Sequence, residues 1–305
     1  MQNKKPKCYL PHEYIYNSSG SKHSFYKTMF IEDIMNKIIP ISLERNKDDC
    51  KAVLDCKEND FILIKNILNS LNRTHREESN INRLILNIIK EIVRNIVWYG
   101  ESIYEICKVS DNDIKIVGLI PNNFFDFKLF YIQMPPKNNN KILYPKIISN
   151  KLLWTISVPK ILEKNYSFKT ILLQIDQFDS FMPKAMKNDL YKNNNTSSYD
   201  YKKYDEKCFI FVNDLTRDWG WDQRQWTSNS KTTEFYNIYK QIKFRYSISI
   251  LREHIIFELN NLFFRLGINA KIKLENVITQ NEYKEKLENF LKGQITYDEI
   301  IKFLY

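Results

Sequence analysis

Three aspartates spaced by four residues are the first candidates for a metal site in this chain. Asp214, Asp218 and Asp222 would line one face if residues 213–222 formed a helix. Clustered carboxylates bind Mg²⁺, as in metal-dependent nucleases. Gly220 and the neighbouring tryptophans are unfavourable in such a helix. We therefore expect no metal site and keep a metal-dependent nuclease as the least favoured alternative.

His254 is a second candidate, as a general base near Glu253 and Glu258. The apolar pattern places it in the middle of a long helix, and no motif sets a serine or cysteine nucleophile beside it. The five cysteines are odd in number, form no CxxC pair and have no zinc-ligand spacing, which favours a reducing, intracellular setting. With six glycines the chain has no Walker loop and no dinucleotide fingerprint. We expect no enzymatic activity and no cofactor.

The chain is basic, with a net charge of +10, which suits a polyanionic partner. Residues 187–207 alternate lysines, asparagines and tyrosines and contain no apolar period. They are predicted to form a surface loop or, as the alternative, a strip on which lysines hold phosphates and rings stack on bases. The candidate DNA-facing residues are Lys187, Lys192, Lys202 and Lys203.

The clearest predicted element is an amphipathic helix that begins at Asn80 and ends at Gly100. Its apolar residues recur every three or four positions, Ser79 or Asn80 can cap its start, and glycine suits the left-handed backbone at its end. Strands at 101–109 and 114–120 follow, joined by a turn at 110–113, and Pro121 closes the second.

The remaining pattern alternates helices and short strands. Helices are predicted at 25–41, 49–71, 167–178, 230–266, 281–291 and 296–304, and strands at 124–132, 142–148, 152–158, 208–212 and 270–274. The long helix has a phase shift near 247–249, which indicates a bend or a change of packing partner, and Gly267 is its predicted cap. Trp219, Trp221 and Trp226 precede it and are expected to anchor a loop by packing. The fold class is α+β.

In this order the elements resemble the portal proteins, or head-to-tail connectors, of tailed bacteriophages. The resemblance lies in the helix that runs into Tyr99-Gly100, in Tyr104-Glu105-Ile106, in the turn at 111–113 and in Leu119-Ile120-Pro121. A second match is the long helix 235–266, followed by Ile272-Lys273-Leu274 and by the stretch 291–299, with its Gly-x-Ile-Thr pattern and Glu299.

The resemblance implies a subunit with four segments: an N-terminal arm (1–25), a wing part with the hairpin (26–150), a stem- and clip-like middle (151–230), and a long wing helix with closing helices (231–305). The crown would be absent or reduced. It implies a ring of about twelve copies at the capsid vertex of the virion, assembled in the host cytoplasm. The ring would conduct double-stranded DNA during packaging and ejection.

The partners implied by the resemblance are the major capsid protein, the terminase large subunit and neck or adaptor proteins, with no membrane. Trp221 and Trp226 lie where such families place a loop that faces the channel, and Gly100, Pro121 and Gly267 are structural. The main alternative is an intracellular nucleic-acid-binding protein, a defence or replication factor that uses the 187–207 strip.

Overall fold

The computed structural model describes residues 6–14, 25–40, 50–71, 78–110, 113–136, 143–180, 201–224 and 233–304. Helices and small antiparallel sheets make up these residues, so the α+β class predicted from the sequence is confirmed. The chain forms two compact units. The first contains residues 1–19, 38–157 and 252–277, and the second contains residues 20–37, 158–251 and 278–305. Both units are therefore assembled from three separate stretches of sequence.

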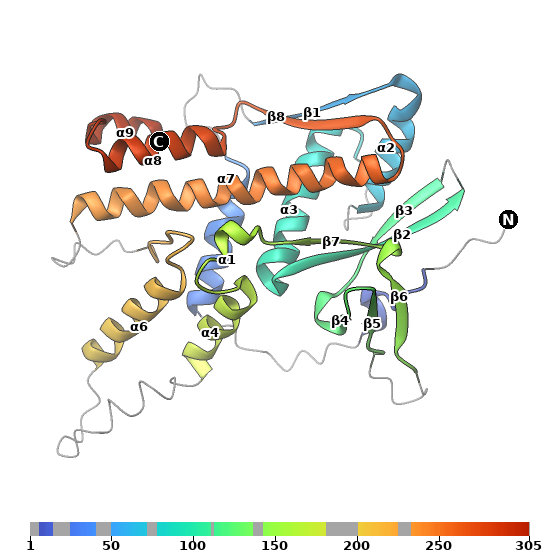
Figure 1. Cartoon of the computed structure of the whole chain (residues 1–305), viewed down its shortest axis with the longest axis horizontal. Coiled ribbons are helices and arrows are strands. Elements are labelled where there is room, and N and C mark those ends of the chain that lie inside the picture. Colours follow the sequence, from blue (N-terminus) through green and yellow to red (C-terminus); the bar gives the residue numbers. More distant parts are fainter. Residues whose placement is uncertain are drawn as a thin grey trace, which may run out of the picture. The chain divides into compact units, whose positions relative to one another are not determined.

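The centre of the first unit is helix α3 (Ile81–Tyr99), which Figure 1 shows beside strand β2. Its apolar stripe is buried, Asn80 accepts a hydrogen bond from the amide of Arg83, and Gly100 ends the helix with φ of 84°. Both predicted caps are thus confirmed. The hairpin β2 (Glu101–Ser110) and β3 (Asp113–Gly118) follows at once, because the left-handed glycine turns the chain directly into a strand.

Three sheets lie in the first unit (Figure 1). Strand β2 is central in the sheet β3-β2-β7, in which β7 spans Leu153–Ser157. A second sheet has the order β4-β5-β6, from β4 (Phe124–Asp126), β5 (Phe130–Gln133) and β6 (Lys146–Ser149). The third pairs β1 (Lys51–Cys56) with β8 (Ala270–Glu275) in antiparallel register. Helix α2 (Glu58–Leu71) packs against β3, where the hydroxyl of Ser70 accepts from the amide of Ile116.

The described part of the N-terminal arm, including the short helix η1 (Pro11–Glu13), is docked within the first unit. The buried carboxylate of Glu105 accepts the amides of Lys7 and Cys8 at 2.7 and 3.0 Å. The buried amide of Gln133 accepts from the Tyr9 backbone amide and donates to the Tyr9 carbonyl. The described residues of the arm therefore find hydrogen-bond partners within their own chain.

The second unit is helical. It contains most of α1 (Phe25–Ile38), α4 (Phe168–Ser180), α6 (Tyr201–Leu215), the first part of α7 (Glu234–Arg265), α8 (Gln280–Leu291) and α9 (Tyr297–Leu304). Helices α4 and α6 contact each other. The contacts of α7 change between Leu251 and Arg252, where its second part joins the first unit. The phase shift predicted at 247–249 therefore coincides with a change of packing partner.

Three predictions were wrong in detail. Residues 49–71 were expected to be one helix, but 51–56 form β1, whose alternate residue Ala52 is buried against β8. The predicted strand 124–132 is a hairpin, because Lys128 turns the chain with φ of 67° while its amide donates to Asp126. Residues 208–212 were expected to be a strand but belong to α6.

The reason for the last difference is the spacing of the buried residues. Cys208, Val212 and Leu215 are buried at helical intervals, and Ile210 between them is exposed. A run of apolar residues this short does not distinguish a strand from a helix by its period. Short 3₁₀ helices complete the fold at Pro121–Asn123, Asn150–Leu152 and Lys160–Leu162.

Candidate functional site

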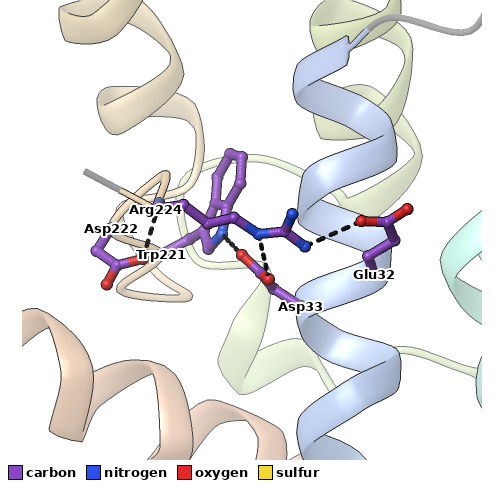
Figure 2. A network of polar contacts seen from close by, with 5 residues as sticks. All are labelled: Glu32, Asp33, Trp221, Asp222 and Arg224. Carbon is purple, nitrogen blue, oxygen red and sulfur yellow. Dashed lines mark hydrogen bonds and ion pairs between the residues drawn. The ribbon is translucent and has the colours of Figure 1, made fainter. Parts of the chain in front are cut away.

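The turn after α6 is fixed by a cluster of charged and aromatic side chains in the second unit (Figure 2). Trp221 is fully buried and donates its indole N–H to Oδ2 of Asp33 at 2.7 Å. Nε of Arg224 donates to Oδ1 of the same carboxylate at 2.7 Å, and its Nη2 reaches Glu32 at 3.0 Å. Asp33 is thus satisfied by two donors from one turn, which locks that turn onto α1.

The backbone of this turn is unusual. Gln223 and Arg224 both have positive φ, at 61° and 54°, which costs free energy for residues with a Cβ. The Arg224 amide donates to Asp222, and the side-chain amide of Gln223 donates to the carbonyl of Phe209. Gly220 approaches α7 so closely that an added Cβ would lie 2.7 Å from the Cβ of Lys243. The side-chain network therefore holds a strained path against α7.

Aromatic packing completes the anchor. Three aromatic rings surround Phe30 of α1. The distance from the centroid of its ring is 5.0 Å to that of Trp221, 5.7 Å to that of Trp219 and 6.0 Å to that of Phe168. The packing role predicted for the tryptophans is confirmed for Trp219 and Trp221. This burial does not support the interpretation of Trp221 as a channel-loop residue, and Trp226 lies outside the described residues.

Two lysines lie near the turn, of which Lys240 is buried and Lys37 is half-buried. Lys240 of α7 donates to Oδ1 of Asn213 and to the carbonyl of Trp221, and burial, with the nearby charge of Lys243, lowers its pKa to about 8. Burial also lowers the pKa of Lys37, whose ammonium lies 4.8 Å from the centre of the Phe244 ring. Lys240 is therefore held inside the unit.

The predicted DNA-facing lysines are not placed by the described structure. Lys187 and Lys192 lie outside the described residues, and Lys202 and Lys203 lie in the first turn of α6, where the backbone alone is described. Residues 201–207 of the predicted strip are helical, which the sequence analysis did not anticipate.

The three aspartates that were considered for a metal site, Asp214, Asp218 and Asp222, each accept hydrogen bonds from a different residue. Asp218 accepts from the backbone and side-chain amides of Asn165 at 2.8 and 2.9 Å, and Asp214 accepts from Tyr166 at 3.4 Å. Asp222 accepts the Arg224 amide. Over the ranges that the structure describes, no group of three His, Cys, Asp or Glu side chains could hold a metal ion. These carboxylates fix loops.

Two of the described thiols, those of Cys8 and Cys107, are poor nucleophiles. Burial, followed by the charge of Glu105, raises the pKa of the Cys8 thiol well above its usual range, and burial raises that of Cys107 to about 11. Both are therefore protonated near neutral pH. His254 lies within α7 and is half-buried, as the helical pattern predicted.

A cavity of about 250 Å³ lies in the first unit, between β7 and the second part of α7. Arg265 lines it and donates to the carbonyls of Leu153 at 2.8 Å and Asn150 at 3.3 Å. The buried indole N–H of Trp154 on its wall has no partner among the described residues. Among the described lining residues, Glu258 is the one carboxylate, and Thr155 and Tyr131 add hydroxyl groups.

The sheet β4-β5-β6 and its connections carry several exposed apolar residues. Phe125, Phe127, Leu129, Met134 and Ile147 are all exposed, although they belong to one small sheet and its connecting turns. A patch of this kind on a folded chain marks a surface that contacts another molecule.

Comparison with known proteins does not assign the chain to a family. No protein-family model matches it, and no curated protein matches it. None of the described helices combines the length and apolar character that crossing a membrane requires. Sequence reasoning missed Asp33, Arg224, Glu105 and Gln133, although one signal was present: Asp33 lies within the apolar stripe of α1, between the buried Phe30 and Ile34.

Proposed function

We propose that this chain is the subunit of a portal-like ring that conducts double-stranded DNA at a capsid vertex. The observation that carries the proposal is the order of elements in the second half of the chain. Helices α4 and α6 pack together, an anchored tryptophan turn follows, and the 32-residue helix α7 then leads to β8 and two closing helices. The last part of this order, a long helix followed by a strand and two closing helices, is the order on which the resemblance to portal proteins rests.

The chemistry of the described residues agrees with a conduit. A channel through which DNA slides needs no base-reading side chains and no reactive groups, because contacts that hold bases would retard passage. The buried polar groups of this chain fix loops and helix ends. The major capsid protein, the terminase large subunit and neck proteins are the proposed partners in the virion.

Native mass spectrometry and negative-stain microscopy of the purified chain test the proposal. The expected result is a closed ring of about twelve copies with a central hole wide enough for duplex DNA. A chain that stays monomeric or dimeric and binds DNA with a steep salt dependence would overturn it in favour of the nucleic-acid-binding alternative.

A further inference from the structure

The outer face of the sheet β4-β5-β6 follows directly from its strand register. Phe125 lies opposite Ile132, and Ile132 lies opposite Ile147, so these three apolar side chains form one row across the sheet. Phe125 is 53% exposed and Ile147 is 74% exposed. The turn between β4 and β5 adds Leu129, which is 82% exposed.

The opposite face of the same sheet is already covered. Phe124, Tyr131 and Ile148 point inward, and they pack with Leu153 and Ile103 in the core of the first unit. The sheet is therefore apolar on both faces, which is typical of a sheet with a layer on each side. The first unit supplies one of these layers.

The exposed apolar area of the sheet approaches that of one side of a standard interface. At about 200 Å² for a large apolar side chain, the exposed fractions of Phe125, Phe127, Leu129, Met134 and Ile147 amount to about 600 Å². This value is at the upper limit for the largest patch of an ordinary monomer, and it approaches the roughly 800 Å² that each partner contributes to a standard interface.

A second apolar surface lies on the part of α7 that belongs to the first unit. Phe257 and Phe264 are two helical turns apart, on one side of the helix, and are 58% and 86% exposed. Glu258 and Leu262 of the same helix line the cavity together with Tyr131, which is on the inner face of the sheet. The inner face is thus the one turned toward α7, so the phenylalanines cannot cover the outer face of their own sheet.

We propose that the outer face of β4-β5-β6 receives the Phe257–Phe264 side of α7 from a second copy of this chain. The two surfaces differ, so the contact is heterologous: each copy offers its sheet to one neighbour and its helix to the other. Such a contact repeats and closes into a ring when the rotation between copies allows it. Ring closure rests on the proposed function, whereas the pairing of the two surfaces rests on their exposure and area.

Paired variants test this contact. Leu129→Glu with Ile147→Glu removes the sheet surface, and Phe257→Glu with Phe264→Glu removes the helix surface. Asn59→Glu, at an exposed position of α2, adds a carboxylate elsewhere in the unit as the matched control. We expect rings from the wild-type chain and from the control, and monomers from each double variant, by native mass spectrometry.

Mixing the two double variants is the decisive step. The sheet variant keeps its helix surface, and the helix variant keeps its sheet surface. We therefore expect one-to-one heterodimers, which cannot grow because the other surface of each copy is disrupted. A photo-cross-linker at position 147 is expected to label the 252–265 peptide of a second copy, which tests the contact without adding charge. Heterodimers or this cross-link also establish that the chains are folded.

The outcomes separate the contact from the function. Rings that persist in both double variants overturn the contact and leave the portal proposal intact. If the Phe257→Glu, Phe264→Glu variant still assembles and the sheet variant does not, the helix is not the partner of the sheet. Open or small wild-type oligomers that both double variants lose support the contact and overturn the portal proposal. A wild-type chain that is monomeric at high concentration overturns both.

Discussion

Asp33→Ala is the sharpest test of the anchor beneath the tryptophan turn. The substitution leaves the buried Trp221 indole N–H without its acceptor, which costs about 1–3 kcal/mol. It also breaks the ion pair to Arg224, whose side chain is 34% exposed, so screening limits that loss to about 1 kcal/mol. The free energy of unfolding should fall by about 2–4 kcal/mol in total.

Urea unfolding followed by far-UV circular dichroism measures this change. The melting temperature should fall by on the order of 3–6 °C, because the unfolding entropy of a chain of 305 residues is large. Glu32→Ala is the matched control, because Glu32 contacts the same Arg224 but is 53% exposed. It should cost less than about 1 kcal/mol. Equal effects of the two substitutions would refute the reasoning, since the argument depends on burial of the Asp33 carboxylate.

A double-mutant cycle then isolates the indole contact. Trp221→Phe removes the donor while keeping an aromatic ring, and the Asp33→Ala, Trp221→Phe chain should be more stable than the sum of the single effects predicts. The expected coupling energy is about 1 kcal/mol. Strict additivity would mean that the 2.7 Å hydrogen bond contributes nothing measurable.

Further expectations concern three other positions. Gly220→Ala should lower the melting temperature more than Gly267→Ala. Both glycines have φ near 75°, but an added Cβ would collide with Lys243 at Gly220 and would meet open space at Gly267. Equal losses would contradict the close approach of Gly220 to Lys243. Glu105→Ala should accelerate hydrogen exchange of the Cys8 amide at least tenfold, whereas an unchanged rate would show that the arm is held otherwise. Burial lowers the pKa of Lys240 to about 8, so between pH 8 and 10.5 the unfolded chain binds more protons than the folded chain. The free energy of unfolding should therefore rise over this pH range. Lys240→Met should flatten the rise, as measured by urea titrations at several pH values.

The sequence predicted the elements whose signals are local. The helix from Asn80 to Gly100 has its apolar period, its side-chain cap and its left-handed glycine within 21 consecutive residues, and all three are in place in the structure. The hairpin β2-β3, the helix α7 and the cap at Gly267 were predicted for the same reason. Each of these patterns is decided by neighbours along the chain.

The sequence could not predict features that depend on distant partners. Strand β1 exists because β8 pairs with it residue by residue, from Lys51 opposite Glu275 to Cys56 opposite Ala270. The pattern of 51–56 alone suited a helix equally well. In the same way the exposed row of Phe125, Ile132 and Ile147 becomes visible only when the register of three strands is known.

The amino-acid sequence by itself therefore determined the fold class, the long helices and their ends, and the tryptophan turn as an anchor. Tertiary structure alone decided what the turn is anchored to, because Trp221 and Asp33 are 188 positions apart and no periodic pattern links them. It also decided which apolar residues stay exposed. Burial is a property of the packed chain, and the same phenylalanine serves as core or as a contact surface according to what covers it.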